Sequence, residues 1–461
     1  MKNNIILNTD SYKASHYKQY PAGTKFVSSY VESRGGHWDK TVFFGLQALI
    51  KEYLTTPITQ GMIDEAEEIF LGHGEPFNRE GWEYILNKHN GYMPVEIKAL
   101  KEGTVISTRN ALIQIVNTDE NCPWVTSYLE TLILRSGWYA TTVATLSYHI
   151  KQDIIKGLNT SADDPAAVIN FMLNDFGSRG VSSYESSALG GLAHLVNFMG
   201  SDNIPAIVAA RRLYDCKMAG FSIPAAEHST ITSWGRENEV AAYRNMIKQF
   251  APNKILAVVS DSYDIYNACK HLWGGSLKDE VINSGARVVV RPDSGDATTV
   301  PVKCVEILME KFGYTVNSKG FKVLPTYIRV IQGDGINQDS IKEIIKNMLS
   351  AGYSLENVCF GMGGGLLQQL DRDTLKFAMK CSAIMIGDTW QDVYKDPIDD
   401  KGKASKKGVL AVVKYDVTGE YITIREKELS GRKNYLEPVY RNGEVLRTQT
   451  LDEIRVLAAA V

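Results

Sequence analysis

The feature that most constrains the fold is a series of short apolar runs, each ending abruptly in charged residues, glycine or histidine. Runs of this length are typical of strands buried on both faces of a sheet. Helix-like stretches separate most of them, for example 340–349 and 366–380. This alternation predicts parallel strands, which we expect to close into an irregular α/β barrel. The runs with their polar ends are 171–179 (FMLNDFGSR), 225–230 (AAEHST), 255–264 (ILAVVSDSYD), 288–295 (VVVRPDSG), 328–335 (IRVIQGDG), 358–365 (VCFGMGGG) and 384–388 (IMIGD).

The length of 461 residues indicates two or three domains. Residues 1–150 are mixed, whereas 408–447 read as β-structure with turn signals at Thr418-Gly419 and Asn442-Gly443. We therefore predict an α/β catalytic domain over 151–390. We also predict a β-rich second domain assembled from 1–150 and 391–461.

Composition excludes several classes of protein. A net charge of −3 gives no general support for nucleic-acid binding. The six cysteines are widely spaced and form no CxxC pair, which favours reduced thiols over disulfides. The first residues lack the apolar core of a signal peptide, and no run of 18 apolar residues occurs. We expect a soluble cytoplasmic protein that binds neither nucleic acid nor membrane.

Polar residues at the ends of the runs predict an active site. In parallel barrels the chemistry lies at the carboxyl ends of the strands. Each residue also has an ordinary structural interpretation, such as a turn aspartate or a self-paired Arg–Asp bridge. Their recurrence on neighbouring strands favours a site. The polar ends carry Asp175, Arg179, His228, Asp261, Arg291, Asp293, Asp334 and the glycine run 361–365.

The glycine run predicts an anion site, because its backbone N–H groups can approach a phosphate closely. A tight strand-to-helix turn is the structural alternative. The run is not GxGxxG, since Leu366 holds the last position, and no GxxxxGK[ST] occurs. Dinucleotide-binding and P-loop chemistry are therefore disfavoured. Arg291 and Asp293 lie two residues apart, which suits recognition of a phosphate or carbonyl together with a sugar hydroxyl.

His228, preceded by Glu227, is the candidate nucleophile. A single histidine is more often structural, but Asp261 on the next run could orient the ring and stabilise its cation. No HExxH or paired-histidine spacing occurs, so a zinc site held by the protein is not expected. A Mg²⁺ ion held by substrate phosphates would leave no such signature. Late basic residues could bind anions, although Lys406 and Lys407 read as a solvated loop.

Taken together, nine segments resemble the nicotinamide phosphoribosyltransferases, which belong to the type II phosphoribosyltransferases. Each segment alone is weak, but their number and order over nearly the whole chain are specific. They are TDSYKxxHYKQYP (9–21), DFGSRGVSS (175–183), HLVNFMGSD (194–202), SIPAAEHSTIT (222–232), VVSDSYDIYNAC (258–269), RPDSG (291–295), RVIQGDG (329–335), GMGGGLLQ (361–368) and KDP (395–397).

The resemblance implies a homodimer with its active site at the interface. It implies that nicotinamide and 5-phosphoribosyl 1-diphosphate form nicotinamide mononucleotide and diphosphate. Mg²⁺ would be bound mainly through the substrate diphosphate, and ATP hydrolysis would be coupled through a phosphohistidine.

By position, the resemblance also assigns residues. His228 matches the phosphorylated histidine, with Glu227, Asp261 and Asp293 as further catalytic residues. Phe176 and Tyr12, the latter from the other subunit, match the rings that enclose nicotinamide, and Asp202 matches the acceptor of its carboxamide N–H. The remaining substrate contacts would be Arg179, Arg291, Gly333, Asp334, Gly363 and Gly364. Ligands for diphosphate or ATP would be Arg34, Arg372, Lys380, Lys395 and Lys403.

Some features depart from the family, and alternatives remain. The segment 35–42 is short, and Ser178 and Met362 replace the tyrosine and serine of vertebrate members, which concerns the shape of the tunnel. A nicotinate phosphoribosyltransferase of the same fold is the first alternative, and the carboxylate of Asp202 argues against it. An unrelated barrel lyase or phosphatase and a non-catalytic binding protein are the others.

Overall fold

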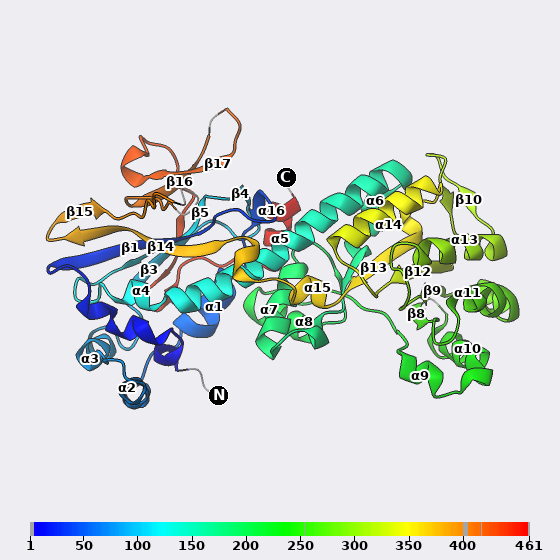
Figure 1. The fold of residues 1–461 in the computed structure, drawn as a ribbon, viewed down its shortest axis with the longest axis horizontal. Helices are drawn as coiled ribbons and strands as arrows, with labels where there is room; N and C mark the ends of the chain where they lie inside the picture. Colours follow the sequence, from blue (N-terminus) through cyan, green and yellow to red (C-terminus); the bar gives the residue numbers. More distant parts are fainter. Residues whose placement is uncertain (1–3, 253, 400–403, 416, 460–461) are drawn as a thin grey trace. The chain divides into compact units, whose positions relative to one another are not determined.

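The computed structural model describes residues 4–252, 254–399, 404–415 and 417–459. The chain forms two compact units, whose elements Figure 1 follows along the sequence. The first unit comprises Met1–Thr145, Ala210–Cys216 and Leu370–Val461, and the second comprises Leu146–Ala209 and Lys217–Gln369. The sequence-based boundaries differ from this division, because 210–216 and 370–390 lie in the first unit.

The second unit is built around a parallel sheet. Its six strands follow the order β7-β6-β13-β12-β9-β8, and every neighbouring pair is parallel. Most of the apolar runs predicted as strands form it, and their side chains are largely buried, as expected for a sheet covered on both faces. The strands are β6 (Leu173–Asp175), β7 (Gly200–Ser201), β8 (Ile255–Val259), β9 (Arg287–Arg291), β12 (Ile328–Gln332) and β13 (Val358–Met362).

Segment 221–226 joins the two edge strands of this sheet. It bridges β7 through Gly200–Phe221 and β8 through Ala225–Ala257, both in parallel orientation. The N–H of Phe221 donates to the carbonyl of Met199, and the N–H of Ala226 donates to the carbonyl of Ala257. The sheet therefore closes into an irregular barrel, and the predicted fold class is confirmed.

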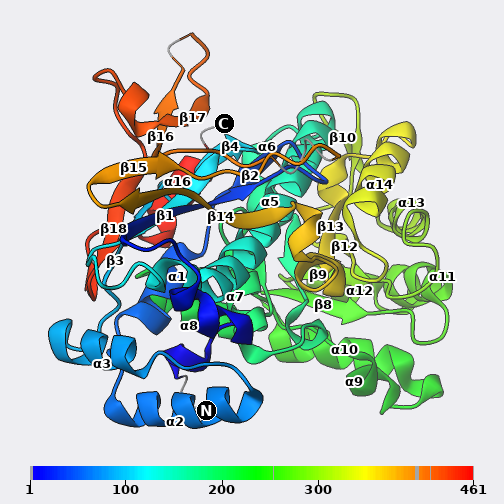
Figure 2. The same ribbon diagram turned by 60° about the vertical axis from the view of Figure 1, so that its left-hand side comes forward.

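Amphipathic helices cover the outside of the barrel. In α14 (Gln338–Ser350) the buried residues Ile341, Ile344, Ile345 and Met348 recur at the spacing of one helical face. The side chain of Asn337 caps the first turn. Figures 1 and 2 show α13 (Val300–Phe312) and α14 beside β9 and β12. The predicted helix over 340–349 is confirmed.

The predicted helix over 366–380 and the predicted barrel strand at 384–388 are wrong. Helix α15 (Gly364–Leu367) ends after one turn, and Asp371 caps a separate 3-10 turn at Arg372–Thr374. Lys376 then has a φ of 49°, which a helix does not allow. The chain continues as β14 (Phe377–Ile386), an antiparallel strand of the first unit.

The first unit contains an antiparallel seven-stranded sheet with the order β15-β14-β1-β5-β3-β18-β19. Strand β1 (Thr24–Ser33) lies between β14 and β5 (Ala111–Asn117). The C-terminal strand β18 (Glu437–Arg441) pairs with β3 (Val95–Ala99), so the two ends of the sequence share one sheet. Strands β15 (Thr389–Asp392) and β19 (Glu444–Val445) form the edges. Within the described ranges, no helix has the length and apolar character needed to cross a membrane.

A buried aromatic pair fixes the carboxyl end of β8. Trp273 is fully buried and stacks on Tyr243 of α10 (Glu239–Phe250), with ring centroids 4.6 Å apart and an interplanar angle of 3°. Its indole Nε1 donates to Ser260 Oγ at 3.0 Å. The N–H of Ser260 donates to the carbonyl of Arg291 at 2.9 Å, so the ends of β8 and β9 are tied together.

We expect Trp273→Ala to lower the free energy of unfolding by about 3–5 kcal/mol, since it empties a large buried volume. The exposed Trp234 offers a matched control, and Trp234→Ala should change this free energy by less than about 0.5 kcal/mol. Urea unfolding followed by circular dichroism measures both. Equal losses in the two variants would contradict a special role for the Trp273 stack.

Candidate active site

Parallel pairing brings the predicted site residues to one end of the barrel. Phe176, Asp202, Asp261, Asp293 and Asp334 each lie one or two residues beyond the end of a parallel strand. Because the strands are parallel, their carboxyl ends meet at the same edge. The hydrogen bonds and ion pairs described below involve Asp202, Asp261 and Asp293.

His228 is held by a carboxylate at this edge. It begins the short helix α9 (His228–Thr232), directly after the segment that closes the barrel. Its Nε2 lies 2.9 Å from Asp261 Oδ1, and Ser294 Oγ donates to Asp261 Oδ2 at 2.5 Å. The side chain of Asp261 is 4% exposed and that of His228 is 46% exposed. The ring is therefore oriented from its buried side and open to a ligand on the other.

The second nitrogen of His228 faces Asp293. Nδ1 lies 3.9 Å from Asp293 Oδ2. Since an ionised Asp261 only accepts hydrogen bonds, Nε2 carries the proton of the neutral ring and Nδ1 holds the lone pair. The arrangement therefore presents Nδ1 as a nucleophile or proton acceptor.

Several charges surround Asp293. Burial raises the pKa of Asp293, and the nearby carboxylates of Asp261 and Asp334 raise it further. Arg291 and His228 act in the opposite direction. The Arg291–Asp293 ion pair is loose, at 3.8 Å, and Arg291 Nε is buried without a hydrogen-bond partner in the described part of the chain. The ion pair with Asp293 therefore does not use all the donors of Arg291, and this side chain can still bind a ligand.

Two of these carboxylates could serve the Mg²⁺ ion that the sequence resemblance implies. Asp293 and Asp334 supply oxygen donors of the kind that Mg²⁺ prefers. Burial is the main cause of the raised pKa of Asp293, and the carboxylates of Asp261 and Asp334 lie close enough to add to it, against Arg291 and His228. With a diphosphate on the same edge, Asp293 and Asp334 would hold Mg²⁺ directly or through water.

Asp202 lies at the end of β7 with one oxygen available. Ser222 Oγ donates to Asp202 Oδ1 at 2.5 Å, and the backbone N–H of Asp202 donates to the carbonyl of Asp175. The Asp202 residue is exposed, so its other oxygen can accept a hydrogen bond from a ligand. Sequence reasoning missed Ser222 as the residue that orients it, although Ser222 opens the segment SIPAAEHSTIT.

Asp175 supports the edge from the interior and does not face a ligand. Its side chain is buried, and it accepts hydrogen bonds from the Gly177 N–H at 2.7 Å and from Asn203 Nδ2 at 3.0 Å. Burial raises the pKa of Asp175 to about 6, against the effect of these donors. Asp175 thus fixes the turn that presents Phe176.

Phe176 covers the interior of the barrel mouth. Its ring packs with Ile223 and Cys359 against the small cluster of Ala257, Val289 and Ile331. A Cβ at Gly361 would lie 2.0 Å from Phe176 Cε2, so only glycine leaves room for the ring. Sequence reasoning interpreted the glycine run as an anion site or a tight turn and missed this role of Gly361.

The other predicted residues of the second unit surround this centre. Gly333 lies against Asp293 and Phe176, since a Cβ there would be 3.3 Å from Asp293 Oδ1. A Cβ at Gly364 would meet nothing within 4 Å, which leaves open space beside the backbone. Glu227 precedes α9 and accepts a hydrogen bond from Ser229 Oγ. The remaining predicted residues, Arg179, Asp334 and Gly363, lie on the same edge, the first two exposed.

Cations gather around Lys380 in the first unit. Burial lowers the pKa of Lys380, and the charges of Arg34, Lys13 and Arg372 lower it further, against Glu130. Arg34 Nη2 is buried without a hydrogen-bond partner in the described ranges, which suits an anion. Three of the predicted phosphate ligands therefore lie together. Lys13 was missed as a fourth cation, although it stands in the segment TDSYK.

Other predictions for the first unit have mixed outcomes. The Tyr12 side chain is exposed, at 53%, in the 3-10 helix Ser11–Lys18. Lys395 is exposed, and Lys403 lies outside the described residues. Lys406 was read as solvated, but its Nζ lies 2.5 Å from Glu32 Oε2 and its N–H donates to Tyr30 Oη, so this interpretation is wrong.

Comparison with known proteins gives the family. The profile of the nicotinate phosphoribosyltransferase (NAPRTase) family matches residues 171–444, and that of the nicotinamide phosphoribosyltransferase N-terminal domain matches residues 4–97. A nicotinamide phosphoribosyltransferase from Xanthomonas campestris is 53% identical over 99% of this chain and 98% of its own length. One from Acinetobacter baylyi is 30% identical over 97% of this chain and 95% of its own.

Solved structures support the fold. The structure of a nicotinate-nucleotide pyrophosphorylase from Pyrococcus furiosus covers 99% of this chain and 95% of its own chain, with a TM-score of 0.64 and 16% sequence identity. The structure of human nicotinic acid phosphoribosyltransferase covers 98% of this chain and 92% of its own chain, with a TM-score of 0.56 and 14% sequence identity. The barrel edge, the two family profiles and the full-length relatives agree: the chain belongs to the nicotinate phosphoribosyltransferase family and, within it, to the nicotinamide phosphoribosyltransferases, which are pentosyltransferases.

Proposed function

We propose that this protein transfers the 5-phosphoribosyl group from 5-phosphoribosyl 1-diphosphate to nicotinamide, in NAD salvage. The observation that carries the proposal is the meeting of Phe176, the Ser222-bound Asp202 and the His228–Asp261–Asp293 group at one end of the barrel. An aromatic ring, an acceptor for an amide and a charged edge suit a pyridine amide next to a phosphorylated sugar.

The reaction requires charge stabilisation and positioning. Loss of diphosphate from ribose C1 leaves cationic character on the sugar and negative charge on the leaving group. Bound Mg²⁺ would supply electrostatic stabilisation of that leaving group. Phe176 holds the pyridine ring by stacking, and Asp202 fixes its rotation, so that the ring nitrogen faces C1. That nitrogen carries no proton, and no general base is needed at the attacking atom.

Asp202 determines the choice of base in this proposal. Oδ1 is occupied by Ser222, and the other oxygen accepts a carboxamide N–H. The carboxylate of nicotinate offers no donor there and would be repelled. The alternative, a nicotinate phosphoribosyltransferase, is therefore disfavoured by the same residue.

Replacing Asp202 by Asn tests this assignment. We expect Asp202→Asn to lower kcat/KM for nicotinamide about tenfold to hundredfold, the equivalent of one charge-assisted hydrogen bond. The preference of the variant for nicotinamide over nicotinate should decrease as well. Asp339→Asn, an exposed aspartate on α14, is the control and should change neither value. A wild-type protein that used nicotinate as well as nicotinamide would contradict the role of Asp202.

We further propose that ATP phosphorylates His228. The lone pair of Nδ1 would attack the γ-phosphorus, the bond to the β-phosphate oxygen would break, and ADP would leave. Asp261 would stabilise the ring by accepting from Nε2. Water would later cleave the P–N bond and release phosphate. The phosphoryl group would add negative charge beside Asp293, and this charge would favour binding of the Mg²⁺ ion that accompanies the diphosphate.

His228→Ala should abolish ATP hydrolysis and its stimulation of mononucleotide synthesis. Slow synthesis should remain, because Asp202 and Phe176 still position the base. Labelling with ATP that carries a radioactive γ-phosphate should mark the wild type with an acid-labile, base-stable group. Asp261→Asn should reduce this label, and the exposed His271→Ala should retain it. Label in the His228→Ala protein would refute the proposal.

We also propose that the active form is a homodimer in which each site takes Tyr12 from the other subunit. The exposure of this ring and its cation contact with Lys13, 5.2 Å from Nζ to the ring centroid, support a role in binding.

Mixing Tyr12→Ala and Phe176→Ala proteins under subunit exchange tests this arrangement. Each variant alone should be inactive, whereas hybrid dimers contain one site with both rings. A statistical mixture should therefore recover about a quarter of the wild-type activity, because half of the dimers are hybrids with one intact site of two. Fluorescence of nicotinamide mononucleotide after derivatisation measures the product. No recovery despite demonstrated exchange would mean that both rings come from one chain.

A further inference from the structure

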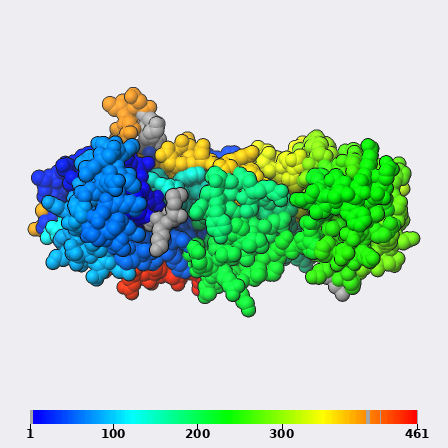
Figure 3. Space-filling model, turned by 90° about the horizontal axis from the view of Figure 1, so that it is seen from below, coloured from blue at the N-terminus to red at the C-terminus, as the bar shows by residue number. Residues whose placement is uncertain are grey.

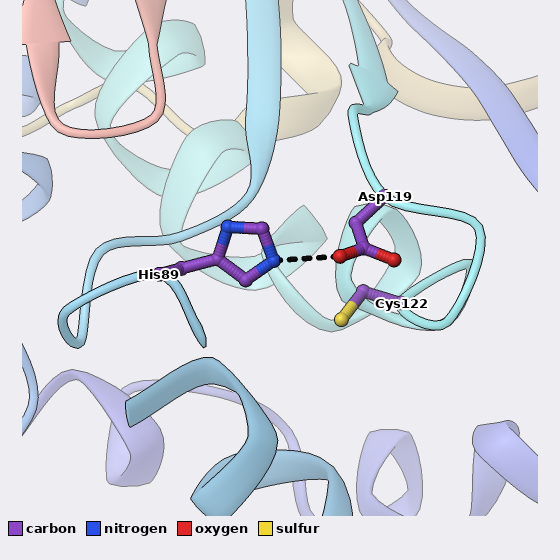
Figure 4. Close-up of side chains that lie close together, drawn as sticks. All are labelled: His89, Asp119 and Cys122. Atoms are coloured by element: carbon purple, nitrogen blue, oxygen red, sulfur yellow. Dashed lines mark hydrogen bonds and ion pairs between the residues drawn. The ribbon is translucent and has the colours of Figure 1, made fainter. Parts of the chain in front are cut away.

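A cluster of three different metal-binding side chains lies in the first unit, apart from every residue assigned to the reaction. His89, Asp119 and Cys122 each offer one donor atom, and these atoms all lie within 4.8 Å of one another. Figure 4 shows the His89 ring and the Cys122 side chain beside the carboxylate of Asp119, with the two segments approaching from different directions. Within the described residues, no other group of three such side chains brings its donor atoms this close together.

Local structure fixes the three donors before any ligand binds. His89 is the C-terminal cap of α3 (Arg79–Lys88), and its N–H donates to the carbonyl of Ile85. Asp119 and Cys122 share one turn, in which the N–H of Cys122 donates to the carbonyl of Asp119 at 3.0 Å. The donors therefore come from two hydrogen-bonded segments, and His89 and Asp119 are 30 residues apart in the sequence.

Asp119 has one oxygen committed to this turn and one directed to the cluster. Oδ1 accepts from the N–H and from Nδ2 of Asn121, at 2.8 and 3.0 Å. Oδ2 lies 2.8 Å from His89 Nε2 and accepts from Tyr84 Oη at 3.0 Å. Carboxylates that bind metals are usually held by hydrogen bonds in this way.

We propose that His89, Asp119 and Cys122 bind one Zn²⁺ ion. Nitrogen, oxygen and sulfur donors together suit zinc, which bonds them at about 2.0–2.3 Å in tetrahedral geometry. Such bonds place donors roughly 3.3–3.8 Å apart, so the His89–Asp119 pair opens by about 0.5–1 Å when the metal enters. Water takes the fourth position, since three protein ligands leave it open.

Burial and exposure agree with a site that an ion can reach from one side. Cys122 is fully buried. The side chains of His89 and Asp119 are 18% and 17% exposed, which gives the ion an approach. Binding would release the Cys122 thiol proton to solvent, and the neutral His89 ring would carry its N–H hydrogen on Nδ1 while Nε2 binds the metal.

The site would clamp the end of α3 to the loop after β5. Helices α2 (Gln60–His73) and α3 lie at the surface of the first unit, in the blue part of Figure 3. They have a long sequence separation from the β5–α4 loop, where α4 is Val125–Tyr128. Zinc would therefore stabilise the folded state without entering the reaction.

Cobalt tests the site, because a Co²⁺–thiolate bond gives a near-ultraviolet charge-transfer band. Full-length protein is purified with chelator and a phosphine reductant, then titrated with Co²⁺ and afterwards with Zn²⁺. We expect one Co²⁺ per chain with the band, and its loss when zinc displaces cobalt. Wild-type protein that shows no band at saturating cobalt would overturn the proposal.

Variants identify the ligands. Cys122→Ser should lose the band, and His89→Ala should lose or strongly weaken it. Tyr84→Phe should weaken binding about tenfold by removing a support of Asp119. Cys381→Ser changes a half-buried thiol elsewhere in the first unit and should bind normally. A band that persists in Cys122→Ser, or disappears in Cys381→Ser, would assign the metal to another thiol and refute the site.

A second measurement follows thermal unfolding instead of absorption. Zn²⁺ should raise the thermal midpoint of the wild type and leave that of Asp119→Asn unchanged, because a ligand stabilises only the state that binds it. Equal shifts in both proteins would contradict the assignment.

Discussion

Closure of the parallel sheet by segment 221–226 is the constraint on which the candidate site depends. Its backbone hydrogen bonds to Met199 at one edge and Ala257 at the other place both of its ends. The first end carries Ser222 to Asp202, and the second carries His228 to Asp261. Without this closure, the proposed determinant of base choice and the proposed nucleophile would lie at opposite open edges of a sheet.

Hydrogen bonding, incomplete charge pairing and packing each contribute differently to this edge of the barrel. Asp261 is buried and fully hydrogen-bonded, so it holds the His228 ring in one orientation. Asp293 and Arg291 remain incompletely paired, which is costly in isolation and is the usual signature of groups arranged for a ligand. Beneath them, Gly361 makes room for the Phe176 ring. The interior of the unit is thus closely packed, whereas polar groups at the barrel edge lack part of their hydrogen bonding.

Much of the fold and site could be predicted from local patterns. Buried apolar runs specify parallel strands, and the polar residue after each run then lies at one edge, as Asp261 and Asp293 do. The prediction failed at 366–388, where apolar residues fit either a helix or a strand. There, the left-handed Lys376 and the pairing of β14 with β1 decide between them, and neither can be read from the sequence of that segment.

The sequence by itself determined the order of the strands along the chain, the family and most of the residues at the barrel edge. Only the tertiary structure decided which of these side chains meet. In the folded chain Ser222 donates to Asp202, Ser294 donates to Asp261, and Gly361 leaves space for the Phe176 ring. The fold also places His89 next to Asp119 and Cys122. The physical reason is that such contacts depend on distances between elements far apart in the chain. Periodicity and spacing describe only the neighbours within one element.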